Sequence, residues 1–179
     1  ACDKLRYISI SQSDVAIEEL KIKITIDNHK KTISISDNGI GMSRDEMIEN
    51  LGTIARSGTK TFIENISKDD DASSQIGQFG IGFYSAFIVS KDVTVLSKKF
   101  DSDEAHLWSS DGTGTYNIQQ VTDKNITGTQ ITIKLAKDAH DFSNTQLVKD
   151  TIKKYSDNIN FPIYLAENST SDGEQINTA

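Results

Sequence analysis

The chain has 179 residues, of which 36% are hydrophobic and 25% charged, and its formal net charge is −7. This length supports one domain with its own core, and the composition is that of a soluble globular protein rather than a disordered chain. The negative charge argues against a domain that binds nucleic acid, because a phosphate backbone favours basic surfaces. It does not argue against a nucleotide, since a few local donors and a magnesium ion outweigh the overall charge.

Cysteine usage and apolar runs indicate the compartment. The single cysteine, Cys2, excludes an intramolecular disulfide framework and is expected to be a small, partly buried thiol in a reducing compartment. The sequence has no signal peptide at its start and no apolar run near the ~20 residues that span a bilayer. We therefore expect a cytoplasmic protein without a membrane partner, and the mitochondrial matrix is the alternative.

The first half of the chain predicts a helix end, a hairpin and a capped helix. Ala1 to Tyr7 is typical of the end of a helix. Lys21 to Asp27 and Thr32 to Ser36 alternate isoleucine with polar residues, which predicts an antiparallel hairpin. Ser43 to Glu46 has the pattern of a capping box, which starts a short helix toward Leu51.

Together with the second half of the chain, these elements predict an α+β fold, namely a two-layer α/β sandwich with a mostly antiparallel sheet and helices on one face. Arg56 to Gln78, rich in serine and aspartate, is expected to form a mobile flap with a helical piece at Lys60 to Ile66. Beyond Ala166 the chain is polar and is expected to fray. The elements predicted in between are a helix from Phe83 to Val89, strands at Val93 to Ser97, Tyr116 to Val121 and Thr129 to Leu135, a helix from Ser143 to Asn158, and a strand from Phe161 to Leu165 with Pro162 at its start.

Two glycine clusters lie between these elements. The first, Asp37 to Met42, follows a strand and precedes the capped helix; the second, Gly77 to Phe83, precedes an apolar helix. Exposed N–H groups and the dipole at a helix start favour an anion, so the second cluster is a candidate phosphate cradle, with a simple tight turn as the alternative. The sequence contains neither a Walker A loop nor a dinucleotide-binding fingerprint.

Asp37 has two interpretations. An aspartate between a strand and a glycine turn commonly forms or caps the turn. It also suits a buried acceptor for an exocyclic amine, such as that of adenine, and Met42 would then supply a soft apolar wall for the ring. The residues alone leave both interpretations open.

Several blocks of the sequence resemble the 90-kDa heat-shock chaperones. They are Asp37 to Met42, the run Asn50-Leu51-Gly52-Thr53-Ile54-Ala55-Arg56-Ser57-Gly58-Thr59-Lys60, Ile76 to Phe87, and Gly128-Thr129. The likeness extends from Ala1 to about Leu165, and the segment around Leu107 to Gly112 is most similar to the bacterial members. DNA gyrase B subunits, MutL mismatch-repair proteins and sensor histidine kinases share the fold, but not the second and third blocks. The resemblance implies a Bergerat-type ATP-binding domain at residues 1–166 and a polar tail, 167–179, that leads toward a middle domain.

The resemblance also implies a role for each matching residue. Asp37 accepts the adenine amine, Gly41 and Thr129 hold the water network around the base, and Met42 and Leu51 line the ring. Asn50 reaches the sugar–phosphate side, and Arg56 stands where the family commonly has a lysine near the phosphates. The stretch from Arg56 to Phe79 is the lid that folds over bound ATP. The phosphates are bound by backbone groups of Gly80, Ile81, Gly82 and Phe83.

The family's catalytic parts are expected outside this sequence. Its motif Glu-x-x-x-Asn-x-x-Asp-Ala supplies the water-activating glutamate and the Mg²⁺-holding asparagine, and Ala1 matches the last position of that motif. The resemblance therefore implies that a strand and a helix precede Ala1, and that a middle domain lends an arginine. It implies a stress-response chaperone that uses ATP/ADP and Mg²⁺, assists unfolded client proteins and forms a homodimer, while this chain alone does not hydrolyse ATP.

The residues alone leave two other functional classes open. One is a relative that acts on DNA or phosphorylates a histidine; the acidic balance argues against it, and His29, His106 and His140 lie in polar stretches typical of surface histidines. The other is a module that binds nucleotide only as a structural ligand.

Overall fold

The computed structural model describes residues 1–11, 18–52, 81–122 and 128–179. The predicted flap and lid between Arg56 and Phe79, with the helical piece at Lys60 to Ile66, lie outside the described residues. Two predicted site residues, Arg56 and Gly80, lie outside them as well.

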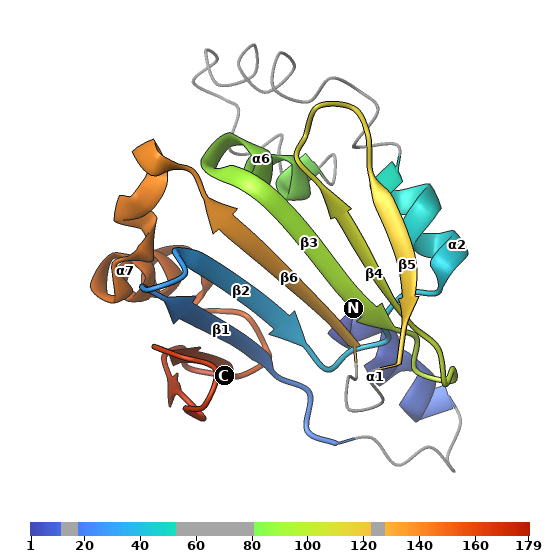
Figure 1. Cartoon of the computed structure of the whole chain (residues 1–179). Helices are drawn as coiled ribbons and strands as arrows, with labels where there is room; N and C mark the ends of the chain where they lie inside the picture. Colours follow the sequence, from blue (N-terminus) through green and yellow to red (C-terminus); the bar gives the residue numbers. More distant parts are fainter. Residues whose placement is uncertain (12–17, 53–80, 123–127) are drawn as a thin grey trace.

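Eight strands form a single sheet, in the order β5-β4-β3-β6-β2-β1-β7-β8 (Figure 1). Every neighbouring pair is antiparallel except β1 and β7, which run parallel. This confirms the predicted α+β class with a mostly antiparallel sheet. The strands are β1 (Ile22–Asp27), β2 (Thr32–Asp37), β3 (Ser90–Lys98), β4 (Ala105–Ser110), β5 (Asn117–Val121), β6 (Gly128–Leu135), β7 (Ile163–Ala166) and β8 (Glu174–Gln175).

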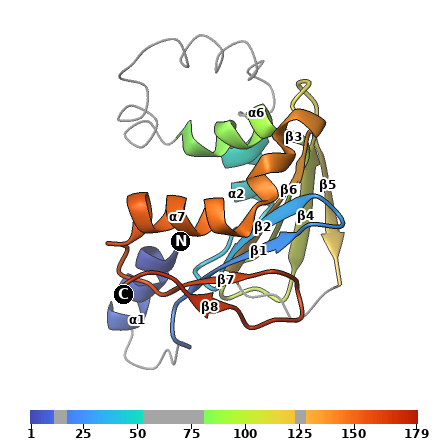
Figure 2. The ribbon, with the colours of Figure 1, turned by 90° about the vertical axis from the view of Figure 1, so that its left-hand side faces the viewer.

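The labelled helices lie on one side of this sheet, as Figure 2 shows. The helix predicted from Phe83 to Val89 is helical throughout, but its first part is a 3₁₀ turn that begins at Ile81. The helical segments are α1 (Cys2–Ser11), α2 (Arg44–Met47) with the π-helical turn η1 (Ile48–Gly52), η2 (Ile81–Ser85), α6 (Ala86–Val89), η3 (Lys137–Ser143) and α7 (Thr145–Ser156).

The predicted hairpin and capping box are both present. In the hairpin, Ile24 pairs with Ile35 and Ile26 with Ile33, so isoleucines of both strands point to the helix-covered face. In the capping box, Ser43 Oγ accepts from Glu46 N, and Glu46 Oε2 accepts from Ser43 N at 2.8 Å. Lys99 Nζ lies 3.0 Å from Glu46 Oε1 and ties this helix start to the end of β3.

Strand β4 was not predicted, and the expectation that its histidine, His106, lies at the surface is wrong. His106 is 5% exposed rather than a surface residue, and it shares the buried face of β4 with Trp108 and Ser110. The buried face of this strand therefore carries two polar side chains, while the half-buried Leu107 lies on the other face. This inverted pattern hides the apolar alternation that marks a strand.

The expectation that residues 167–179 fray was also wrong. Glu174 and Gln175 form β8, which pairs with β7. Ile176 and Asn177 beyond it are buried. A two-residue strand with exposed polar side chains has no periodicity that a sequence pattern can reveal.

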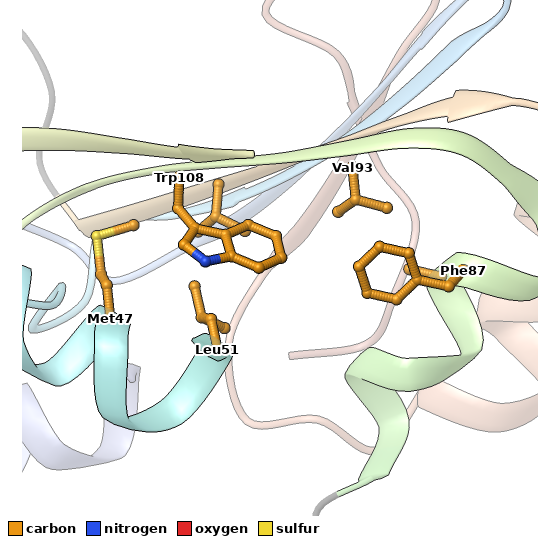
Figure 3. Packing of buried hydrophobic residues seen from close by; sticks show 7 residues of the cluster. Met47, Leu51, Phe87, Val93 and Trp108 are labelled. Atoms are coloured by element: carbon orange, nitrogen blue, oxygen red, sulfur yellow. The ribbon is translucent and has the colours of Figure 1, made fainter. Parts of the chain in front are cut away.

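The main core lies between the sheet and the helices α2, η1 and α6 (Figure 3). Trp108 and Val93 descend from the sheet, Met47 and Leu51 rise from α2 and η1, and Phe87 comes from α6. Trp108, Met47 and Val93 have no exposed surface. We call these residues, together with Ala86 and Val95, the tryptophan cluster.

Candidate nucleotide-binding site

Asp37 ends β2 in the middle of the sheet, between β1 and β6. Its backbone pairs with Ile22 on one side and Thr129 on the other. Its Oδ1 accepts a hydrogen bond from Gly39 N at 2.9 Å, so the carboxylate caps the glycine turn that follows. The turn-forming interpretation of Asp37 is therefore correct, and it leaves the ligand-binding interpretation open because a carboxylate accepts several hydrogen bonds.

The environment of Asp37 disfavours its charged form. Burial raises the pKa of the Asp37 carboxyl above its ordinary value. Hydrogen bonds from the backbone N–H groups of Gly39 and Thr129 offset part of that rise. A further donor such as a ring amine would stabilise the carboxylate in this setting.

Two glycines bring three strand ends together beside Asp37. Gly41 has φ +65, and a Cβ there would lie 1.9 Å from Lys98 O. Gly128 has φ +76, and a Cβ there would lie 2.2 Å from Asp37 O. Both positions combine a left-handed backbone with a close approach of another chain segment, so they require glycine. The turn after β2, the end of β3 and the start of β6 therefore form one compact unit.

Ser97 joins the parts of this unit, and the sequence reasoning did not identify it. Its side chain has no exposed surface. Ser97 Oγ accepts from Met42 N at 2.8 Å, donates to Gly128 O at 3.1 Å and lies 2.7 Å from Thr129 Oγ1. The available signal was a serine that continues the inward alternation of Val93 and Val95 in strand β3.

We expect Ser97→Ala to lower the free energy of unfolding by about 1–3 kcal/mol, because it leaves Met42 N and Thr129 Oγ1 without their buried partner. Ser97→Thr keeps the hydroxyl and should lose less. Urea unfolding of the variants measures the loss. Ser34→Ala is the control, because the hydrogen bond between Ser34 Oγ and Thr132 Oγ1, at 3.0 Å, is only partly buried. A loss no larger for Ser97→Ala than for Ser34→Ala would contradict a special role of Ser97.

Met42, Leu51 and Phe83 meet at the tryptophan cluster. Leu51 is part of it, and the half-buried Met42 and Phe83 pack against it. The Phe83 ring lies edge-on to Phe87 and Trp108, with centroids 5.9 and 6.0 Å away. The structure therefore joins the predicted ring-lining residues to the start of η2 through shared apolar contacts.

Among the described residues, Asn50 and Gly82 form hydrogen bonds within their own helical segments. Asn50 is exposed, and its Nδ2 donates to Glu46 O at 2.8 Å within its own helical segment. Gly82 is exposed, and its carbonyl accepts from Ser85 Oγ. The backbone of Ile81 opens η2, as expected for the last part of a glycine cluster that leads into a helix.

Asp37 also lines a hollow of about 490 Å³, which we call the Asp37 hollow. Its walls come from the start of α1, from β1 and β2, and from the segment between α7 and β7. Ile35 and Ile159, 39% and 37% exposed, give it apolar surface. Burial raises the pKa of the Cys2 thiol at its edge, with a further contribution from nearby Asp37, which agrees with an inert thiol. The lining residues are Ala1, Cys2, Asp3, Ile22, Ile35, Asp37, Asn158, Ile159, Asn160 and Phe161.

The mostly antiparallel sheet, covered on one face by helices and with an aspartate and a glycine turn at the end of a central strand, has the architecture of the Bergerat-type ATPase fold. Residues 14–154 match the family described as histidine kinase-, DNA gyrase B- and HSP90-like ATPases. The chain belongs to this family.

Bacterial chaperones are among its most similar relatives. The chain is 52% identical to the chaperone protein HtpG of Campylobacter jejuni (strain RM1221) over 168 residues, which covers 92% of this chain and 27% of the relative. It is 47% identical to HtpG of Wigglesworthia glossinidia brevipalpis, covering 97% of this chain and 28% of that protein. For HtpG of Rickettsia massiliae (strain Mtu5) the identity is 45%, with coverages of 100% and 29%. The chain thus spans less than a third of the length of these relatives.

Within the described residues, no helix is both long and apolar enough to cross a membrane.

Proposed function

We propose that the chain binds ATP and ADP through adenine recognition at Asp37, as the nucleotide-binding part of an ATP-dependent chaperone. In this proposal ATP binding and hydrolysis in the whole protein close and reopen a clamp that assists unfolded or stress-damaged proteins. The family is one of ATPases and includes all three classes. The relatives carry the name chaperone, which supports this class over a DNA-acting enzyme or a histidine kinase.

One observation carries the proposal. Asp37 and Gly41 belong to one short turn, whereas Thr129 lies far from them in sequence; all three are predicted to serve the adenine and its waters. In the structure the backbone of Asp37 pairs with Thr129, while the side chain of Thr129 contacts Ser97 Oγ. Ser97 in turn holds the backbone of Met42, directly after Gly41. A turn-forming aspartate alone does not require this convergence.

The remaining roles follow from the resemblance. Asn50 reaches the sugar–phosphate side, Arg56 stands near the phosphates, and the backbone from Gly80 to Phe83 binds them. Mg²⁺ comes with the nucleotide, and its asparagine ligand and the water-activating glutamate belong to a helix on the N-terminal side of Ala1. The apolar surface of Ile35 and Ile159, beside Ala1 in the Asp37 hollow, is of the kind that such a helix would cover.

We propose that residues 1–166 form the main part of the ATP-binding domain and that the chain beyond them, after completing the sheet through β8, leads toward a middle domain. The protein acts as a cytoplasmic homodimer on partly folded clients, without nucleic acid or membrane as a partner; a matrix address in mitochondria is the alternative.

A comparison of ADP with GDP tests the adenine proposal. Guanine has a carbonyl oxygen where adenine has its amine, so Asp37 would face an acceptor and lose its hydrogen bond. We expect calorimetric titration of the full-length gene product to give a Kd for ADP at least about 100-fold below that for GDP. Titration with inorganic pyrophosphate controls for binding through phosphate alone. Equal affinity for ADP and GDP would overturn adenine recognition at Asp37.

A further inference from the structure

The C-terminal segment 174–178 is attached to the domain by several independent contacts. Its backbone continues the sheet, with Ile176 N donating to Ile163 O at 2.9 Å. The Ile176 side chain is buried in the cluster formed by β1, β7 and α7. At the surface, Lys149 Nζ of α7 lies 2.8 Å from Glu174 Oε2. In Figure 2 the end of the chain lies below α7.

Asn177 makes the most specific of these contacts. The side chain is 7% exposed. Its Oδ1 accepts from Ile163 N at 2.8 Å, while its Nδ2 donates to Ile159 O at 3.1 Å and to Phe161 O at 2.9 Å. One amide thus satisfies the first N–H of β7 and two carbonyl groups of the segment 158–162, which forms neither helix nor strand.

That segment is a wall of the Asp37 hollow. Residues 158 to 161 all line it, opposite the start of α1. Phe161 is also buried against Cys2, Leu5 and Leu20, and Ile40 of the glycine turn packs against the same group. A continuous set of contacts therefore leads from Asn177 through Phe161 to the turn that follows Asp37.

We propose that Asn177 is a positioning residue for nucleotide binding. By holding residues 159 to 163, its amide keeps one wall of the Asp37 hollow and the glycine turn in place, and it makes this wall depend on the attachment of the C-terminal segment. The proposal rests on the proposed function, because it assigns Asn177 a part in the same site without contact to the nucleotide.

Three variants of the full-length gene product test this role. Asn177→Ala removes all three hydrogen bonds, and Asn177→Ser, which supplies a single hydroxyl in place of the amide, is the milder version if the alanine variant does not fold. Lys149→Ala is the matched control, because it breaks a contact of the same C-terminal segment but leaves the Asn177 amide intact. We expect the Kd for ADP to rise about 10-fold for Asn177→Ala and about 3-fold for Asn177→Ser, with less than about 2-fold for Lys149→Ala.

Amide hydrogen exchange at residues 159–163 is the second readout, and it needs no nucleotide. Exchange should accelerate there in the Asn177 variants and stay unchanged in Lys149→Ala. A folded Asn177 variant with wild-type exchange and wild-type affinity, or an equal loss in Lys149→Ala, would overturn the role. If the wild-type protein does not bind ADP, the proposed function fails, while exchange at 159–163 still decides whether Asn177 holds this wall.

Discussion

Replacement of Asp37 by asparagine is expected to raise the Kd for ADP about 100-fold, close to loss of binding at ordinary concentrations. The asparagine Oδ1 can still accept from Gly39 N, as Asp37 Oδ1 does at 2.9 Å. The other branch becomes an NH₂ group, which places a donor against the amine of adenine. An opposed pair of donors leaves both groups unsatisfied inside the complex. Calorimetric titration with ADP on the full-length gene product measures the effect.

The same substitution should not destabilise the fold at neutral pH. Because burial raises the pKa of Asp37 in the folded protein, ionising it costs folding free energy. That cost is absent below the unfolded-state pKa and complete above the raised folded-state pKa. Asparagine carries no charge and escapes the cost, so its unfolding midpoint should match or exceed that of the wild type at pH 7. Loss of binding would then reflect recognition rather than unfolding.

Asp27 provides a matched control for the turn-forming interpretation. Like Asp37 it ends a strand, and its Oδ1 accepts from the backbone N–H two residues later, His29 N, at 3.0 Å. Asp27 lies at the opposite end of the hairpin from the site. Asp27→Asn should leave ADP affinity unchanged. Wild-type affinity in Asp37→Asn, or an equal loss in Asp27→Asn, would contradict adenine binding at Asp37.

Local patterns in the sequence were enough to predict most of the fold. The isoleucine alternation of β1 and β2 and the capping box at Ser43 are signals carried by a few neighbouring residues, and the structure has both. β4 and β8 were not predicted, because contacts with distant parts of the chain, and no local sequence pattern, hold these residues as strands. The inward face of β4 carries His106 and Ser110, and β8 is attached mainly by Ile176 and Asn177, which lie beyond the strand itself.

The sequence indicated residues of the candidate site but not the contacts that join them. The glycine turn after Asp37 is visible in the sequence. Thr129 lies 92 positions after Asp37, and only the resemblance to a family assigned it to the same site. Ser97 is different, because a buried serine in a strand is ordinary until its partners are known. Only the three-dimensional arrangement shows that Ser97 Oγ contacts Met42 N and Thr129 Oγ1 together. Asn177 was missed for the same reason.

The second large expected effect concerns the hydrolysis of ATP. We expect the 179-residue chain alone to release no phosphate from ATP above background. The acidic residues that line the Asp37 hollow are Asp3 and Asp37. Asp37 is assigned to the adenine, at the far end of the nucleotide from the γ-phosphate, so it cannot activate the attacking water. Phosphoryl transfer depends on a group that orients or deprotonates that water and on a metal that neutralises developing charge.

A series of three proteins tests this expectation by phosphate release. The 179-residue chain should be inactive. The chain extended on its N-terminal side by the proposed helix, with its proposed glutamate and asparagine, should bind ADP more tightly, and only the full-length gene product should turn over fully. The extended helix should also cover Ile35 and Ile159 and raise the unfolding midpoint, because apolar surface leaves water. An inhibitor that competes with ADP separates genuine turnover from contaminating ATPase. Inhibitor-sensitive hydrolysis by the 179-residue chain would show that a residue within it activates the water, and the assignment of that role to a preceding helix would be wrong.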